Sequence, residues 1–310
     1  MDLFEEKNKT PMLIGEMQDA FDSTDYIFEL KLDGVRCLAY LDQTGTELRN
    51  KRHLRVTSIY PELADIHKQI KKRCILDGEL VVIGGDGKPD FSEMKRRALM
   101  HNDFKIKLAS AKLTVSFVAF DMVYLDGKQL TDLPLMERKE LLETTVKENE
   151  RLAISRYIEE KGTQLYALAE QQNLEGIVAK RKDSKYFFGK RTKDWIKIKN
   201  LLDDDFVICG YIEKENNVVS IVLGQYHENQ LVYKGHVTLG VSSYDFQKIQ
   251  NLKRIDCPFA SIPKGNENAV WLKPKLVCTV KYMEKLTGGS LRQPILKGLR
   301  DDKDPKDCTI

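Results

Sequence analysis

The stretch Glu29-Leu30-Lys31-Leu32-Asp33-Gly34-Val35-Arg36 decides how the first part of the chain is organised. Residues 26–30 and 35–41 have the apolar and β-branched composition of strands, and Asp33-Gly34 favours a turn between them. Lys31 then lies at a strand end, with Arg36 five residues further on. Lysine can act as a nucleophile where burial or nearby cations lower its pKa. A solvated hairpin with charged flanks has the same pattern, so this motif alone does not separate the two interpretations.

Length and composition indicate a soluble globular protein of about two domains. The chain has 310 residues, of which 42% are hydrophobic and 31% charged. It contains no apolar run near twenty residues and begins without a secretory signal pattern, so we expect a cytoplasmic protein with no membrane association. Its six cysteines form no C-x-x-C pair, which favours reduced thiols over a zinc site or a disulfide framework.

The charge balance does not by itself indicate a nucleic-acid-binding protein. Fifty Lys and Arg residues stand against 47 Asp and Glu, a net charge of +3. Binding to nucleic acid would require these basic residues to cluster in space.

The first two hundred residues alternate strand-like and helix-like segments. Strands are predicted over residues 74–83, 113–120, 176–180 and 195–199, the first of them ending at Gly84-Gly85. Helices are predicted over residues 61–72 and 164–172, and over a segment near 134–146. That last helix has Thr131 or Asp132 as its expected cap and Pro134 in its first turn.

The remaining residues have a different pattern, which begins after an acidic break at residues 201–205. Strands are predicted over 206–212, 218–225, 231–239 and 275–283, with a turn at His227-Glu228-Asn229. One helix is predicted over 244–252, capped by Ser242 or Ser243. This pattern indicates a small β-barrel, and an OB-type barrel is one candidate among several.

Three positions in the first part carry side chains that suit nucleotide chemistry. Glu79 follows a turn in a strand-rich run and could hold a ribose or a metal-bound water, or it could simply face solvent. Phe120 could stack on a nucleobase, although aromatic residues at strand ends more often belong to the core. Glu175 begins an apolar strand, where it could complete a Mg²⁺ shell around phosphates or face solvent.

Two pairs of cations complete the pattern. Lys197 and Lys199 lie two residues apart, so on a strand they share a face, where an anion such as phosphate would relieve their repulsion. Lysines on an exposed edge strand have the same spacing. Arg300 and Lys303, near the C-terminus, suit either phosphate binding or a solvated tail.

Taken in chain order, these motifs resemble the ordered set found in covalent nucleotidyltransferases. That group includes ATP-dependent DNA ligases, mRNA-capping guanylyltransferases and RNA ligases. The intervening stretches YLDGKQLTDLPLMERKELL, LEGIVAKRKDSKYFFGKRTKDWIKIK and WLKPKLVCTVKYMEKLTGGSLRQPILKGLR look most like ATP-dependent DNA ligases, and among them the bacterial ligase-D type of non-homologous end joining. The likeness runs from about residue 28 to residue 303.

The resemblance implies a role for each matching residue. Lys31 takes the place of the nucleophile that becomes linked to AMP. Nucleotide binding is implied for Glu29, Lys31, Arg36, Arg52, Glu79, Phe120, Glu175, Lys197 and Lys199. Metal binding is implied for Glu79 and Glu175, and catalysis for Lys31, Arg36, Arg52, Lys197, Lys199, Arg300 and Lys303.

The arginine motif after the nucleophile departs from the usual S-R-N-G-like pattern. It reads Arg49-Asn50-Lys51-Arg52-His53, so Arg52 is the chosen match and Lys51 the alternative. Only thirty residues precede Lys31, which leaves no room for the separate N-terminal DNA-binding domain of replicative eukaryotic-type ligases. Zinc-type cysteines and the extra domains of NAD-dependent ligases are also missing, which favours ATP.

The fold class implied is α+β. A nucleotidyltransferase (adenylation) domain of antiparallel sheets with helices, residues 1–201, would precede an OB-fold barrel, residues 202–310, with residues 201–205 as the hinge. The function implied is an ATP-dependent DNA ligase that uses Mg²⁺, or Mn²⁺, to seal nicks.

The expected setting is a monomer acting on nicked or broken double-stranded DNA in a bacterial or phage-type, nucleoid-associated context. The ligase-D likeness adds a Ku-like end-binding partner. Two alternatives stay open: a GTP-dependent capping-type guanylyltransferase, and a non-catalytic OB-type DNA-binding protein.

Overall fold

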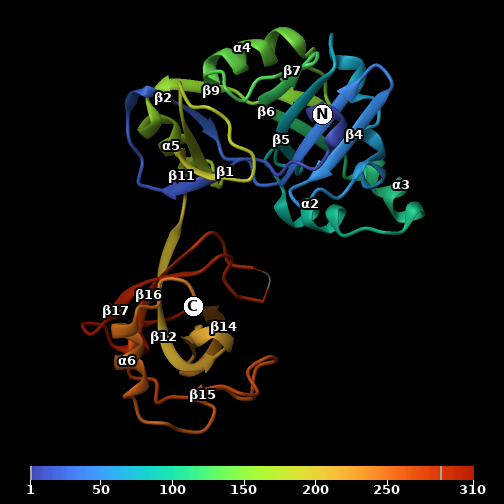
Figure 1. Ribbon diagram of the computed structural model, residues 1–310. Coiled ribbons are helices and arrows are strands. Elements are labelled where there is room, and N and C mark those ends of the chain that lie inside the picture. Colours follow the sequence, from blue (N-terminus) through green and yellow to red (C-terminus); the bar gives the residue numbers. More distant parts are fainter. Residues whose placement is uncertain (1, 287) are drawn as a thin grey trace. The chain divides into compact units, whose positions relative to one another are not determined.

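The computed structural model describes residues 2–286 and 288–310, and it divides into two compact units (Figure 1). The first unit ends at Asn200 and the second runs from Leu201 to Ile310. Two sheets form the first unit and one sheet forms the second. Among the described residues, no helix has the length and apolar character needed to cross a membrane.

The first sheet has five strands and carries Lys31 at the end of one of them. Its order is β1 (Leu13–Met17), β11 (Arg191–Lys199), β10 (Gly176–Arg181), β2 (Ser23–Leu30) and β9 (Tyr157–Glu160). The pair β1–β11 is parallel and the other pairs are antiparallel. Helix α5 (Gly162–Gln171) buries Ala169 against Phe28 and Ile177 of this sheet.

The second sheet of this unit has six strands. Its order is β4 (Gly45–Asn50), β3 (Val35–Asp42), β5 (Cys74–Val82), β6 (Val115–Leu125) and β7 (Lys128–Gln129), with β8 (Leu152–Ile154) beside β6. Successive side chains of a strand point to opposite faces, so this sheet has two apolar faces. Cys37 and Ala39 face a core that includes Met94, whereas Leu38 and Tyr40 face a core that includes Trp195 of the first sheet.

Helices cover the second sheet on the side away from the first. They are α2 (Phe91–Ala98), α3 (Asp103–Lys112) and the 3₁₀ turns η1 (Thr57–Ile59), η2 (Pro61–Leu63) and η3 (Ile66–Gln69); α4 (Leu135–Thr145) packs on β6, and α1 (Leu3–Glu6) lies at the N-terminus. Asp90 caps α2 and Asn102 caps α3 through side-chain oxygens, each accepting a backbone N–H in the first turn. The sequence analysis did not predict α2 or α3.

Most predicted strands and helices of the first unit are confirmed, but three predictions are wrong. The Asp33-Gly34 turn does not close a hairpin, because β2 and β3 belong to different sheets. Residues 61–72 form two short 3₁₀ turns, Pro61–Leu63 and Ile66–Gln69, instead of one helix. Helix α4 begins after Pro134 with no side-chain cap from the preceding residues.

The second unit is a six-stranded antiparallel sheet consistent with the predicted OB fold. Its order is β14 (Gln230–Val237), β13 (Val219–His227), β12 (Leu202–Glu213), β16 (Val277–Tyr282) and β17 (Ile295–Arg300), with β15 (Val270–Trp271) beside β12. Helix α6 (Ser243–Gln250) has Ser242 as its cap, as predicted. Glu228 and Asn229 adopt positive φ in the predicted hairpin turn.

The acidic break is part of a strand. Residues Leu202 to Asp205 pair with β16, so the segment expected to be a hinge is mostly the start of β12. Extended pairing of this kind satisfies the backbone groups that a free linker would leave to solvent.

Candidate active site

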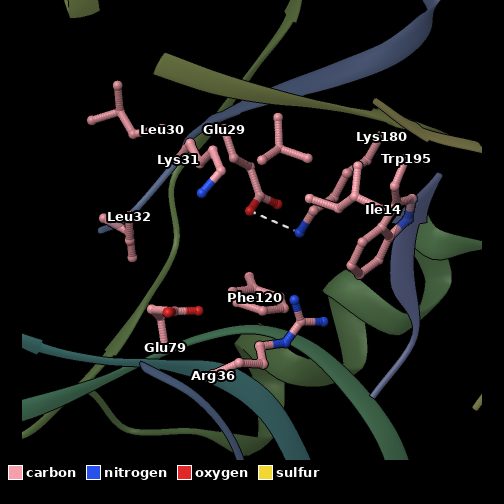
Figure 2. A pocket seen from close by; sticks show the side chains of 11 residues that line it. Ile14, Glu29, Leu30, Lys31, Leu32, Arg36, Glu79, Phe120, Lys180 and Trp195 are labelled. Carbon is pink, nitrogen blue, oxygen red and sulfur yellow. Dashed lines mark hydrogen bonds and ion pairs between the residues drawn. The ribbon is translucent and has the colours of Figure 1, made fainter. Parts of the chain in front are cut away.

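A pocket lies where the two sheets of the first unit face each other. About 420 Å³ of empty space lies in and over this pocket, a volume that includes solvent at its open side. Figure 2 shows Lys31 and Glu29 on one side and Phe120, Glu79 and Arg36 on the other. Its lining is Ile14, Glu29, Leu30, Lys31, Leu32, Arg36, Glu79, Phe120, Val178, Lys180 and Trp195.

Lys31 is held at the rim of the first sheet, directly after β2. Its backbone N–H donates to the carbonyl of Gly176 at 2.9 Å, which fixes the residue beside β10. Its Nζ forms an ion pair with Glu175 Oε2 at 2.6 Å, and the Glu175 side chain is only 5% exposed. Burial raises the pKa of the Glu175 carboxyl above its ordinary value, although Lys31 acts in the opposite direction.

Gly34 is required where the chain passes from the first sheet to the second. A Cβ at this position would lie 2.8 Å from Glu79 Cγ, and closer still to the carbonyl oxygen of Leu80. The predicted turn is therefore a close crossing against β5. That crossing places Lys31 and Arg36 on opposite walls of one pocket.

Arg36 is oriented by a buried carboxylate. Its Nε and Nη2 donate to Asp77 Oδ1 and Oδ2, both at 2.6 Å, and Asp77 is fully buried. Tyr186 also donates to Asp77, at 2.6 Å. The guanidinium carbon of Arg36 lies 4.4 Å from the centroid of the Phe120 ring. The strand therefore presents a rigid cation to the pocket beside an aromatic face.

Glu29 is the centre of a buried charge network. Lys139 and Lys180 both donate to its carboxylate, Lys180 at 2.9 Å, and Ser155 adds a third hydrogen bond at 2.9 Å. Burial alone would raise the pKa of Glu29, but the two ammonium groups outweigh burial and hold that pKa below its ordinary value. Glu29 is thus an ionised acceptor in the pocket wall.

Lys180 contacts the aromatic side chains of the pocket. Its Nζ lies 4.3 Å from the ring centroids of both Phe120 and Trp195. Burial lowers the pKa of Lys180 to about 8, and the like charge of Lys139 lowers it further, while Glu29 acts to raise it. Phe120 therefore lies in the pocket, as a stacking role requires, with Lys180 and Arg36 near its ring.

Glu79 lies on β5 opposite Lys31. Burial raises the pKa of its carboxyl to about 8, even though Arg36 and Lys31 act to lower it. The negative charge of Glu175 contributes to this rise, so the two acids lie close enough to repel. No group of three or more Asp, Glu, His or Cys side chains suited to a metal occurs in the described part of the chain.

Lys197 and Lys199 lie on the face of the first sheet that carries the pocket. Val178, which lines the pocket, is opposite both Glu29 and Lys197 in the ladder, and residues opposite each other share a face. Lys199 is opposite Gly176, next to Glu175, and its charge acts on that acid. Neither lysine lines the pocket itself.

Arg52 and Lys51 occupy an exposed turn after β4 and do not line the pocket. The backbone N–H of Arg52 donates to Asn50 Oδ1 at 2.9 Å, which holds the turn. The preceding Arg49 is engaged locally, by Glu47 at 2.6 Å and the carbonyl of His53 at 2.7 Å.

Arg300 and Lys303 lie together in the second unit around one carboxylate. Asp205 Oδ2 is 2.8 Å from Lys303 Nζ and 3.4 Å from Arg300 Nη1. Arg300 also makes a two-point contact with Asp302, both distances being 2.7 Å.

Sequence analysis missed four residues that build the pocket: Asp77, Lys139, Lys180 and Trp195. Asp77 stands two positions before Glu79, and Lys180 lies on β10, the strand that follows Glu175, so both lay inside motifs already identified. Lys139 gave no signal, because a lysine within a charged helix suggests a solvated face.

Two family profiles match the chain. One, described as ATP dependent DNA ligase domain, matches residues 10–199, and the other, described as ATP dependent DNA ligase C terminal region, matches residues 214–303. Together they cover the sheets that form the pocket and most of the second unit.

Relatives and a solved structure agree with these profiles. The chain is 31% identical over 320 residues to the multifunctional non-homologous end joining DNA repair protein LigD of Mycobacterium tuberculosis H37Rv, covering 98% of the chain but 40% of that protein. It is 28% identical to the SPbeta prophage-derived DNA ligase-like protein LigB of Bacillus subtilis 168, covering 94% of the chain and 98% of that protein. The structure of mycobacterial DNA ligase D complexed with ATP and MES matches with a TM-score of 0.58 and 30% identity, over 98% of both chains.

Proposed function

The chain belongs to the ATP-dependent DNA ligase family, and we propose that it joins the 3′-hydroxyl and 5′-phosphate of a DNA nick through AMP covalently linked to Lys31. One observation carries this proposal. The Lys31 amine lies in a pocket with an ionised acceptor, an aromatic ring and a fixed arginine around it. The ring and the acceptor suit a nucleotide's base, and the arginine suits its phosphates.

The first chemical step would form an N–P bond between Lys31 and the α-phosphorus of ATP. The P–O bond to pyrophosphate would break, and pyrophosphate would leave with the electron pair. Lys31 must lose a proton before it attacks. Glu175 pairs with the ammonium at 2.6 Å. A cation bound by that carboxylate would repel the ammonium and so favour release of the Lys31 proton to water.

Lys197, Lys199 and Arg36 would stabilise the negative charge of the phosphates. Phosphoryl transfer depends chiefly on positioning and electrostatics, so fixed cations beside the reacting group are effective. Arg36 is fixed by Asp77, and the two lysines follow one face of β11. Arg52, in its exposed turn, would contribute only if that turn contacts the nucleotide.

Glu79 and Glu175 fit a single Mg²⁺ or Mn²⁺ ion. Mg²⁺ is commonly held by one or two carboxylates together with substrate phosphates and water, so the absence of a larger acidic cluster among the described residues suits a shared site. Two acids that repel each other, one with a pKa raised to about 8, would both be stabilised as anions by a cation. When bound, the metal would neutralise charge on the phosphoryl oxygens.

The base would lie against Phe120, with the Glu29 carboxylate as a hydrogen-bond acceptor. Adenine carries an amino group that can donate to such an acceptor, whereas guanine presents a carbonyl at the same ring position. An ionised acceptor in the pocket wall therefore favours ATP over GTP, which weighs against a capping-type guanylyltransferase.

The later steps would use the second unit. We assign adenylation to residues 1–201 and DNA and pyrophosphate contacts to the OB fold of residues 202–310, with Arg300 and Lys303 orienting pyrophosphate. AMP would pass from Lys31 to the 5′-phosphate of nicked or broken duplex DNA, and the 3′-hydroxyl would displace AMP to close the strand. Binding through lysines and arginines should weaken steeply as salt rises.

The cellular role is the furthest part of this proposal. The similarity to an end-joining repair protein, 40% of whose length the chain spans, suggests end joining with a Ku-like partner. We expect a monomer in the bacterial cytoplasm, associated with the nucleoid.

Labelling with α-³²P-ATP, α-³²P-GTP and ³²P-NAD in parallel tests the proposal. We expect label only from ATP, its loss in Lys31→Ala, and its release on addition of nicked DNA with formation of sealed strands. Lys7→Ala is a matched control, because Lys7 lies outside the pocket. Label that survives in Lys31→Ala would refute the assignment of Lys31. Label from GTP alone would indicate the guanylyltransferase alternative, and no label from any nucleotide would indicate a non-catalytic protein.

A further inference from the structure

The helical hairpin α2–α3 has a larger net positive charge than the whole chain. Residues 91–113 contain six Lys and Arg residues and two acidic residues, a net charge of +4 against +3 for all 310 residues. The remainder of the chain is therefore slightly acidic. Arg97 is buried and paired with Glu62, so the surface of this segment, which we call the hairpin surface, keeps five cations against two acids.

The hairpin surface also exposes large apolar side chains. Phe104 is 71% exposed, Leu99 65% and Leu108 49%. Phe104 and Leu108 stand four residues apart on α3, so they share one face, while Ile106 and Ala109 are buried. Exposed apolar groups gathered in this way, with polar groups around them, are typical of protein interaction sites.

A groove of about 520 Å³ of open space lies between the two helices. Its lining includes the apolar residues Met100 and Leu108 and the cations Arg96, Lys105 and Lys112, of which Arg96 is paired with Glu93. No ion pair in the described part of the chain engages Lys105 or Lys112, so their charge is available to a ligand.

The hairpin is firmly held, so this exposure does not reflect a loose segment. Arg97 is fully buried and donates to Glu62 at 2.6 Å, to the carbonyl of Ile59 at 3.1 Å and to that of Ile106 at 3.3 Å. Met94 of α2 packs in the core of the second sheet. The groove is therefore a preformed surface, which lowers the entropic cost of binding.

The hairpin surface lies on the side of the second sheet opposite the pocket. Met94 packs against Cys37 and Ala39, whereas Arg36 and Phe120 project from the other face into the pocket. Figure 1 shows α3 at the side of the unit away from β2 and β9. The groove is therefore separate from the pocket that contains Lys31.

We propose that the hairpin surface binds an acidic amphipathic helix of a partner protein. Apolar residues of the partner would fill the groove over Met100 and Leu108, and its carboxylates would meet Arg96, Lys105 and Lys112. Such a helix would contact both the apolar side chains and the cations of the hairpin surface. A DNA backbone would satisfy the cations but leave Phe104, Leu99 and Leu108 without apolar contacts.

The test is the binding of a designed probe to the full chain. The probe is a fluorescein-labelled peptide of about five helical turns, with Leu at every third or fourth position and Glu on the other face. We expect saturable binding in fluorescence anisotropy, weakened about ten-fold or more in Lys105→Glu/Lys112→Glu and likewise in Leu108→Asn. The control Lys128→Glu/Lys147→Glu carries the same charge change outside the hairpin and should bind as the unchanged protein does.

Nick sealing is measured on the same variants to show that each is folded. Sealing should be unchanged by both lysine pairs, because neither belongs to the proposed catalytic machinery. The proposal fails if the peptide does not bind, or if the two lysine pairs weaken binding equally. It also fails if Lys105→Glu/Lys112→Glu lowers affinity for intact duplex DNA as much as for the peptide, because the surface would then be a nucleic-acid site.

Discussion

The carboxylate of Asp77 accepts two hydrogen bonds from the guanidinium of Arg36, each 2.6 Å long. Asp77 is fully buried and Arg36 is 20% exposed, so a charge from the interior sets the direction of a cation in the pocket. Burial would lower the pKa of Arg36, but Asp77 outweighs burial and raises it. Arg36 therefore stays charged, and its position is fixed before any nucleotide arrives.

Asp77→Asn should reduce both stability and adenylation. Removing one partner of a buried ion pair costs about 3–5 kcal/mol, so urea unfolding should show a loss of about 3 kcal/mol. In the protein that remains folded, Lys31 adenylation should fall about ten-fold, because Arg36 is no longer fixed beside Phe120.

Glu62→Gln provides the matched control for Asp77→Asn. Glu62 accepts from the buried Arg97 at 2.6 Å beneath α2, on the side of the second sheet away from the pocket. It should lower stability comparably while adenylation of the folded protein stays unchanged. If adenylation falls as much in Glu62→Gln as in Asp77→Asn, lost stability explains both decreases, and Asp77 does not position Arg36 for adenylation.

The sequence was sufficient to predict the strands that carry Lys31, Glu79 and Phe120. These residues lie in or directly after runs of apolar and β-branched side chains, whose composition favours strands without any tertiary contact. The same reasoning failed for α2 and α3. In α3 the exposed Phe104 and Leu108 reverse the usual relation between polarity and burial, so no apolar stripe marks that helix. Helix α2 is amphipathic but only eight residues long, and its buried face includes a charged residue, Arg97.

The charge network of the pocket could not be predicted for a different reason. Glu29 receives hydrogen bonds from Lys139, 110 residues away, and from Lys180, 151 residues away. A charged side chain in an isolated sequence is most often solvated. Only the pairing of β2 with β10 and the packing around β6 bring the three together.

The Glu79 carboxyl predicts a pH dependence of stability. Its pKa is raised to about 8 in the folded protein from an ordinary value of 4.5. Between these two values the folded protein binds the extra proton, so stability falls as pH rises across this window. The fall is up to about 1.4 kcal/mol per pH unit.

Glu79→Gln should remove this dependence. Thermal unfolding without metal or nucleotide should show similar melting temperatures for the two proteins at pH 5, and a higher one for Glu79→Gln at pH 8. Glu140→Gln, on the exposed side of α4, should follow the unchanged protein at both pH values. A difference between the unchanged protein and Glu79→Gln that is the same at pH 5 and pH 8 would mean that Glu79 does not titrate in this window.

Lys139→Met tests whether the Glu29 network supports nucleotide binding. The change leaves Glu29 buried with one cation instead of two, which should lower stability by about 3 kcal/mol. It should also raise several-fold the ATP concentration needed for half-maximal adenylation, because Glu29 is no longer held as an oriented acceptor. Adenylation at saturating ATP should change little.

Lys182→Met breaks the pair with Glu159, which is partly exposed, and serves as the comparison. Exposed ion pairs contribute about 0–1 kcal/mol, so stability and ATP dependence should both stay close to the unchanged values. Equal ATP dependence in Lys139→Met and Lys182→Met would show that Glu29 is a structural acid only.

Variants of Arg300 and Lys303 should slow one step of ligation and leave another unchanged. If they orient pyrophosphate, Arg300→Ala and Lys303→Ala should slow the formation of enzyme-bound AMP about 100-fold, because each removes a fixed cation from the leaving group. Nicked DNA that already carries AMP on its 5′-phosphate needs no pyrophosphate contact. Sealing of that substrate should therefore proceed at nearly the unchanged rate.

Lys297→Ala is the control, since Lys297 is a neighbouring cation on β17 whose contact with Asp203 is exposed. It should affect neither step strongly. Asp205 gives the converse case, because it contacts both Lys303 and Arg300 within the second unit. Asp205→Asn removes the charge that holds these cations in place. The rate of adenylation should therefore fall, while the rate of sealing of adenylated DNA should stay the same. If Arg300→Ala and Lys303→Ala slow both steps equally, the two cations bind DNA, and pyrophosphate must be oriented by other residues.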